Sequence, residues 1–197
     1  MGDKIRELAS QQPELCDQSG KGFWPVPAMF PQLLAHTIHK LQEKITYLNL
    51  FGKYEEAKLL TEVRLGMLKV VFEGDLGEDH TRLFLDDHKG ILGLDSAEYR
   101  KLPFYDFCKS VLEIENPIVL LGILTRNEEG SLEEAKALTE TKLIGSGEFA
   151  RIHVIEEEEH GRISAKIREA LIQHSEFKED FVKGLALHDL FYSSIIY

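Results

Sequence analysis

Hydrophobic residues recur at intervals of three and four along most of the chain, which is the spacing of one face of an α-helix. Between residues 31 and 51, one such stripe consists of Leu34, Ile38, Leu41, Ile45 and Leu48. Similar spacing and helix-favouring composition predict further helices over residues 54–72, 78–92, 96–101, 103–112, 117–143, 148–173 and 176–195. No segment shows the polar–apolar alternation of a half-buried strand. The pattern therefore predicts an all-α bundle of about seven or eight helices.

Prolines and glycines indicate where these helices begin and end. Gly52 can end the first amphipathic helix, and Asn116-Pro117 can open a later one with proline at the first helical position. Residues 23–31 hold three prolines, which predict a rigid extended entry. Residues 1–22 are polar and predict a loose leader with one short helix. We therefore expect a single helical domain over residues 23–197.

The charge pattern narrows the classes of partner. The formal net charge is −11 at pH 7, and no stripe of lysine and arginine suits a phosphate backbone or an anionic membrane. No apolar run approaches the roughly 18–20 residues that span a bilayer. The first 22 residues lack the apolar region of a secretory signal, and two cysteines are too few for a disulfide framework. We expect a cytoplasmic protein that binds neither nucleic acid nor membrane.

The segment HVIEEEEH, residues 153–160, carries the first candidate site. A helix turns about 100° per residue, so His153, Glu157 and His160 share a face, while Glu156 and Glu159 point elsewhere. A glutamate and a histidine three residues apart occur in di-iron carboxylate bundles, where they bind one metal. Taken alone, the pattern is more often a solvated acidic face with surface histidines.

Two further stretches add candidate ligands. Glu73 and His80 are separated by seven residues, two helical turns, if the helix continues through the intervening glycines. The alternative is a glycine-rich turn with a capping glutamate and an incidental histidine. The third carboxylate is assigned to Glu128, which follows the apolar stretch NPIVLLGIL, with Glu129 as its immediate rival.

Together these motifs resemble those of the heme-oxygenase-like di-metal oxidases, in the CADD-like branch related to PqqC and TenA. The resembling pattern is Glu-x6-His, a glutamate on a later helix, and His-x3-Glu-x2-His. The segments EDHTRLFLDDHKGILGLDSAEYRKL and GILTRNE are also similar to family segments, so the resemblance covers roughly residues 54–165. Three features depart from the family. Glu157 stands where relatives have aspartate, Glu128 is closer in sequence to His153 than is usual, and the part of the chain before residue 54 matches poorly.

The resemblance implies a heme-oxygenase-like bundle that binds two metal ions without heme. The implied ligands are Glu73, His80, Glu128, His153, Glu157 and His160. Three imidazoles and three carboxylates suit iron, with manganese as the alternative. Members of the family activate O2, so the expected function is that of a non-heme di-iron oxidase or oxygenase acting on a small organic molecule. A homodimer is compatible with this expectation. Two alternatives stay open: a metal-free TenA- or PqqC-type cofactor-biosynthesis enzyme, and an inactive binding module.

The remaining histidines have simpler interpretations. His36 and His39 lie three residues apart on an early helix, where heme oxygenases carry their iron ligand. We interpret them as ordinary histidines of an amphipathic helix and expect no heme. His188, next to Asp189, is likewise not expected to bind a metal.

Overall fold

The computed structural model describes residues 2–11, 26–74, 109–141 and 148–195. Within these ranges the chain is almost entirely helical and contains no strand, which confirms the all-α prediction. The helices are α1 (Gly2–Gln11), α3 (Val26–Leu50), α4 (Tyr54–Gly74), α8 (Pro117–Thr141), α9 (Glu148–Gln173) and α10 (Lys178–Ile195). The helices expected over residues 78–92 and 96–101 lie outside the described residues. Of the helix expected over 103–112, only its end at 109–112 is described.

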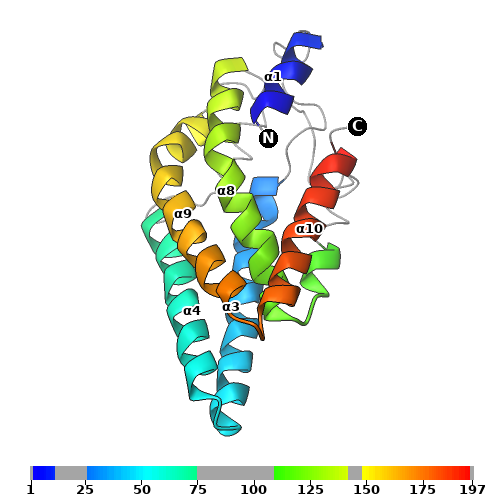
Figure 1. The fold of residues 1–197 in the computed structure, drawn as a ribbon. Coiled ribbons are helices and arrows are strands. Elements are labelled where there is room, and N and C mark those ends of the chain that lie inside the picture. Colours follow the sequence, from blue (N-terminus) through cyan, green and yellow to red (C-terminus); the bar gives the residue numbers. More distant parts are fainter. Residues whose placement is uncertain (1, 12–25, 75–108, 142–147, 196–197) are drawn as a thin grey trace.

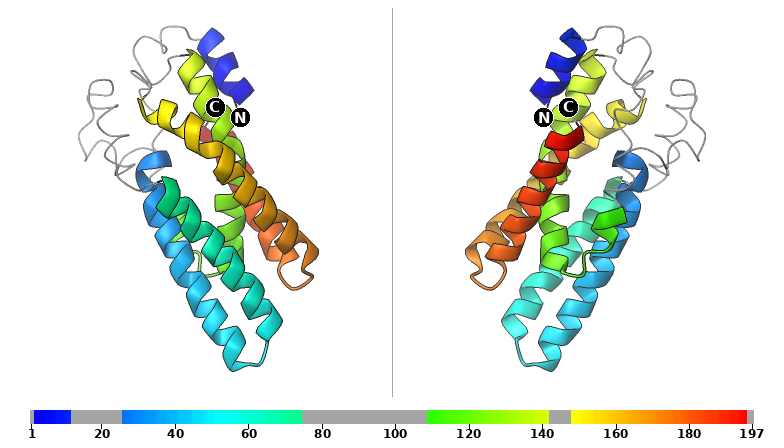
Figure 2. Two further views of the ribbon diagram at one scale, coloured as in Figure 1. Left: turned by 90° about the vertical axis from the view of Figure 1, so that its left-hand side faces the viewer. Right: turned by 90° about the vertical axis from the view of Figure 1, so that its right-hand side faces the viewer.

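Helix α8 occupies the middle of the bundle and packs against both α9 and α10 (Figures 1 and 2). Helices α3 and α4 form an antiparallel hairpin, and α4 also packs against α9. The colour order in Figure 1 shows that α8 and α9 run in opposite directions, whereas α8 and α10 run in the same direction. Side chains from α8 and α9 therefore meet along an antiparallel seam.

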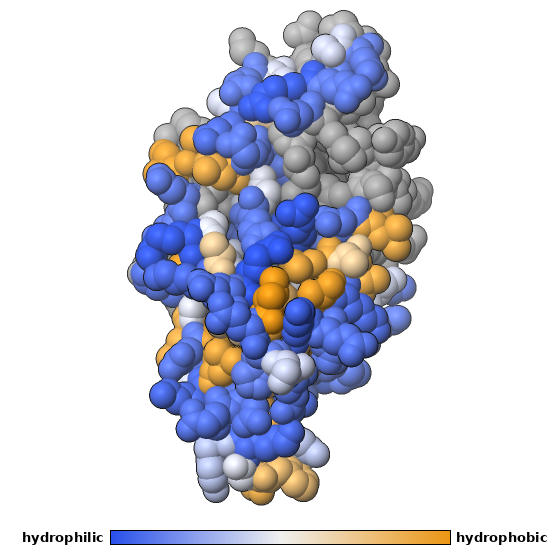
Figure 3. Space-filling model, in the orientation of Figure 1, coloured by the Kyte–Doolittle hydropathy of each residue, from blue (hydrophilic) through white to orange (hydrophobic). Residues whose placement is uncertain are grey.

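The amphipathic stripe predicted on α3 forms part of the core. Leu41 and Leu48 are fully buried, Leu34 and Ile45 are nearly so, and Ile38 packs partly buried against them. The turn between α3 and α4 departs from this pattern, because its apolar residues Leu50 and Phe51 are exposed to solvent. A hydrophobic patch is visible at this end of the molecule (Figure 3, lower end). No helix in the described ranges combines the length and apolar character needed to cross a membrane.

The extended entry expected over residues 23–31 is wrong for residues 26–31, because α3 already begins at Val26. Pro27 falls in the first turn of this helix. The backbone N–H groups of a first turn have no intrahelical acceptor, so a proline there removes no hydrogen bond. Pro31, the sixth residue of α3, removes the one bond that its amide would make to the carbonyl four residues earlier, and the helix continues past it.

The predicted boundaries at Gly52 and Asn116 are confirmed. Gly52 adopts φ +73°, the left-handed conformation that ends α3, and the next amide, of Lys53, donates to the carbonyl of Leu48 at 2.9 Å. At the start of α8 the side-chain oxygen of Asn116 accepts a hydrogen bond from the amide of Ile118 at 3.0 Å, and Pro117 is the first helical residue.

Two glycines set the distance between α8 and α10. A Cβ atom built on Gly122 would lie 2.8 Å from the Cα of Gly184, and the reverse distance is also 2.8 Å. The two backbones are thus in direct contact, which no larger residue permits. This contact fixes α8 against α10 and leaves another face of α8 to meet α9.

Candidate functional site

Glu128 on α8 and His160 on α9 face each other inside the bundle. The Oε2 atom of Glu128 lies 3.4 Å from the Nδ1 atom of His160. Only 3% of Glu128 and 8% of His160 is exposed to solvent. Two of the residues assigned from sequence, 32 positions apart, therefore meet in the core.

The Glu128 carboxylate is an unusual core group. Its Oε2 atom is buried and accepts no hydrogen bond within the part of the chain that the structure describes. A buried carboxylate carries a large desolvation cost unless a cation or hydrogen-bond donors compensate it. A carboxylate oxygen beside an imidazole nitrogen is a donor set that iron and manganese accept. Glu128 and His160 thus supply two donors of the kinds that such a metal ion binds.

Glu129, the sequence rival of Glu128, has different partners. The guanidinium of Arg168 on α9 donates hydrogen bonds to both of its carboxylate oxygens. A second guanidinium, that of Arg126, lies 3.8 Å from Glu129. Glu129 is therefore held by arginines at the edge of the seam, whereas Glu128 faces the buried histidine.

The other four candidates are placed only through their helices or not at all. Glu73 lies in the last turn of α4, and His153 and Glu157 lie in the first half of α9; their side chains are not described. His80 lies outside the described residues. Among the side chains that are described, no three acids, histidines or cysteines gather closely enough to hold a metal ion.

The register between α4 and α9 places Glu73 near the candidate stretch of α9. A Cβ atom on Gly66 would lie 3.5 Å from Ile163, and the ammonium group of Lys69 lies 3.3 Å from Glu159. These helices are antiparallel, so seven residues forward from Gly66 correspond to seven residues back from Ile163. Position 73 is therefore level with position 156, on the side of α4 that meets α9.

A second polar group lies between α8 and α10. Arg126 donates a hydrogen bond to Asp189 at 2.8 Å, and the neighbouring His188 is only 2% exposed. Burial lowers the pKa of His188 to about 4, against the opposing effect of Asp189. Although partial burial raises the pKa of Asp189, the hydrogen bond from Arg126 brings it below its usual value.

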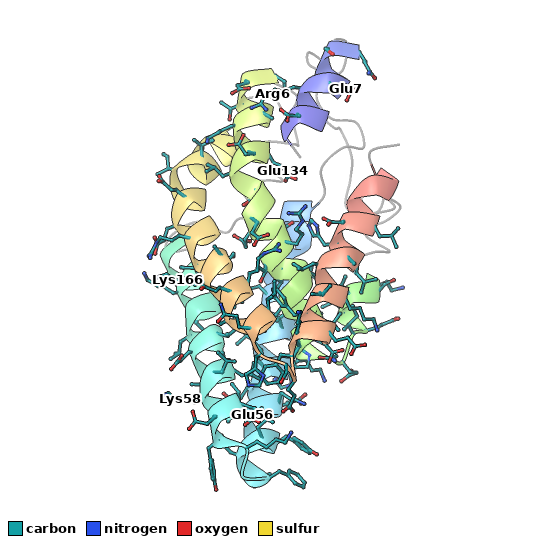
Figure 4. All side chains as sticks on the ribbon, in the orientation of Figure 1. Arg6, Glu7, Glu56, Lys58, Glu134 and Lys166 are labelled. Atoms are coloured by element: carbon teal, nitrogen blue, oxygen red, sulfur yellow. The ribbon has the colours of Figure 1, made fainter. Side chains whose placement is uncertain are left out.

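Sequence reasoning missed several buried polar side chains. Glu134, labelled on α8 in Figure 4, is 4% exposed, and the hydroxyl-bearing Thr125 and Ser164 are fully buried. Helical spacing contained a signal for the last two, because Thr125 precedes Glu128 by three residues and Ser164 follows His160 by four.

The early histidines have simple partners. The Nε2 atom of His36 lies 3.2 Å from the carbonyl oxygen of Ile114, and the exposed His39 lies 3.3 Å from Glu43. Each contact gives the histidine a local structural role at the surface or edge of α3.

Comparison of the chain with protein-family models, with curated proteins and with solved structures found no match.

Proposed function

We propose that the chain is a non-heme di-iron oxidase or oxygenase built on a heme-oxygenase-like bundle. The proposed ligands are Glu73, His80, Glu128, His153, Glu157 and His160. The observation that carries the proposal is the buried approach of Glu128 to His160, at 3.4 Å. This contact joins one candidate ligand from each of two separate sequence motifs, which supports the proposal.

The periodicity of α9 extends this argument to the undescribed ligands of that helix. Residues seven apart lie on nearly the same side of a helix. Position 153 precedes His160 and Ile167 at this interval, and position 157 similarly precedes Ser164 and Leu171. All four of these later residues are buried. By this spacing, positions 153 and 157 are in line with the buried stripe of α9, which is the arrangement that a ligand face on this helix requires.

The surroundings also suit a metal pair. Bound iron would supply the redox chemistry for oxidising a small organic substrate with O2. The chain contributes three carboxylates, which would neutralise most of the charge of two divalent ions. The carboxylate of Glu128 and the imidazole of His160 are themselves nearly inaccessible to bulk water, and Leu124 and Ile163 are buried on the same two helices.

Metal analysis of purified protein loaded with ferrous iron under anaerobic conditions tests this proposal. The wild-type chain is expected to retain about two iron ions per chain, and His160→Ala and Glu128→Gln are each expected to lose at least one. His39→Ala, which changes an exposed histidine, and Glu129→Gln, which changes the neighbouring carboxylate, are the controls and should retain the wild-type content.

Unchanged iron in His160→Ala, with the variant folded by circular dichroism, would contradict the proposal. Wild-type protein without stoichiometric iron after anaerobic loading would instead support the metal-free enzyme or the binding module. Iron-dependent consumption of O2 in the presence of candidate small molecules would then separate an oxidase from a protein that only stores the metal.

A further inference from the structure

Two hydroxyl groups in the core behave differently from the other hydroxyls of the helices. Thr125 and Ser164 are both 0% exposed, and within the described chain neither Oγ atom makes a hydrogen bond. The remaining described threonines each donate to the carbonyl oxygen four residues earlier in the same helix: Thr37, Thr46, Thr61, Thr139 and Thr141. The Thr125 hydroxyl does not use this local acceptor.

The register between α8 and α9 puts these two buried residues at one level of the seam between the helices. On α9, Ser164 is four residues after His160 and four before Arg168, and those two residues contact Glu128 and Glu129 on α8. On α8, Thr125 lies one turn before this glutamate pair. Because the helices are antiparallel, Thr125 and Ser164 occupy the same level, one turn from the Glu128–His160 contact.

Three buried oxygen atoms that have no hydrogen-bond partner among the described residues thus lie within about one turn of each other along the seam: Thr125 Oγ1, Ser164 Oγ and Glu128 Oε2. A buried polar atom that leaves water without finding a new partner destabilises the folded state. Three such atoms at one place would be a large uncompensated cost in a mostly apolar core. A shared ligand that bonds to all three would remove it.

We propose that this seam binds one internal water molecule, which donates to the Glu128 carboxylate and bonds to both hydroxyls. Buried waters typically make about three hydrogen bonds to polar groups that otherwise lack partners. The two hydroxyls can each donate or accept, whereas the carboxylate only accepts, so a neutral ligand with two donors and two acceptors matches the set. An anion would be repelled by Glu128, and full burial of both hydroxyls leaves little room for an organic molecule.

The water would hold the Glu128 carboxylate in its orientation towards His160. Thr125 and Ser164 are then positioning residues that act on Glu128 through the solvent molecule. This inference does not depend on metal binding, because the three unpartnered oxygens belong to the chain itself.

Replacing Thr125 by valine tests the proposal by the sign of the stability change. Thr125→Val keeps the shape of the side chain and removes the hydroxyl. If the hydroxyl bonds to water, the folded-to-unfolded ratio in urea titrations should fall about five- to tenfold. Thr37→Val is the matched control, because Thr37 is equally buried but bonds to its own helix, and its ratio should change less. A rise in the ratio for Thr125→Val would overturn the proposal, since removing a truly unpartnered hydroxyl stabilises a core.

A crystal structure of the full chain that resolves internal waters gives a second test that is independent of folding energies. The expected result is a peak about 2.7–3.0 Å from all three oxygens, lost in the Thr125→Val, Ser164→Ala double variant. A metal on Glu128 would be distinguished by its anomalous scattering and by a shorter distance of about 2.0–2.2 Å. Hydroxyls turned to their own helix carbonyls, without a peak between them, would overturn the water site and leave the di-iron proposal untouched.

Discussion

Glu128 and Glu129 are neighbours in sequence, yet their carboxylates contact different residues of α9. Glu128 lies 3.4 Å from His160 in the core, whereas Glu129 accepts two hydrogen bonds from Arg168. Side chains one residue apart on a helix point about 100° away from each other, so two adjacent residues can contact a buried and a peripheral partner. The two carboxylates therefore differ in what their removal should do.

Neutralising each glutamate in metal-free protein should change stability in opposite directions. Glu129→Gln leaves Arg168 without its carboxylate and should lower the free energy of unfolding by about 2 kcal/mol. Glu128→Gln removes a buried charge whose Oε2 atom accepts no hydrogen bond from the described chain, and should raise it by about 1 kcal/mol. Urea denaturation of chelator-treated proteins measures both. Equal destabilisation by the two variants would mean that Glu128 and His160 form a structural ion pair.

The contact between Gly122 and Gly184 should tolerate no side chain. Gly184→Ala would place a Cβ atom 2.8 Å from the Cα of Gly122 and even closer to the Val119 carbonyl, so α8 and α10 would have to separate. We expect a loss of about 3 kcal/mol or more in the free energy of unfolding. Gly161→Ala is the control, because nothing lies within 4 Å of its Cβ position, and it should stabilise α9 by up to about 1 kcal/mol. Thermal denaturation of both variants compares them directly.

The side chain of Asn116 should stabilise the start of α8. Its oxygen accepts from the Ile118 amide at 3.0 Å, and its amide group donates to Asp180 at 2.7 Å. Asn116→Ala should lower the free energy of unfolding by about 1–2 kcal/mol. Asn116→Ser keeps a capping oxygen but loses the bond to Asp180, so its smaller loss separates the two contributions. If serine is as destabilising as alanine, the link to α10 matters more than the cap.

The helix pattern was predictable because burial on one face of a helix leaves a periodic trace in the sequence. The predicted bounds for α4, α9 and α10 differ from the observed bounds by two residues or fewer at each end. The start of α3 was not predictable from the sequence, because a cluster of prolines usually indicates extended backbone. Pro27 is compatible with a helix because it lies in the first turn. Packing partners such as Gly122 and Gly184 lie 62 residues apart and leave no local trace.

Site residues were predictable only as far as helical spacing carries information. Spacing and the preceding apolar run indicated Glu128 and His160, which the structure brings together. The choice between Glu128 and Glu129 depends on where Arg168 lies in three dimensions, and periodicity cannot supply this. Thr125 and Ser164 were missed because a buried hydroxyl resembles an exposed one in sequence, and their helical spacing from Glu128 and His160 was the one signal available.

The burial of His188 should make the protein less stable as the pH falls through the mildly acidic range. Its pKa is about 4 in the folded chain and 6.5 when unperturbed, so between these values the unfolded state binds a proton that the folded state refuses. Stability is therefore complete above pH 6.5, falls by about 3 kcal/mol as the pH approaches 4, and loses nothing further from this group below that. The lowered pKa of Asp189 acts below this window, since its unperturbed value is 3.8. Urea denaturation from pH 4 to 7 measures how the free energy of unfolding depends on pH. This slope should be shallower for His188→Phe than for wild type, and unchanged for the exposed-site control His39→Ala. Equal slopes in all three proteins would show that His188 takes up its proton without unfolding.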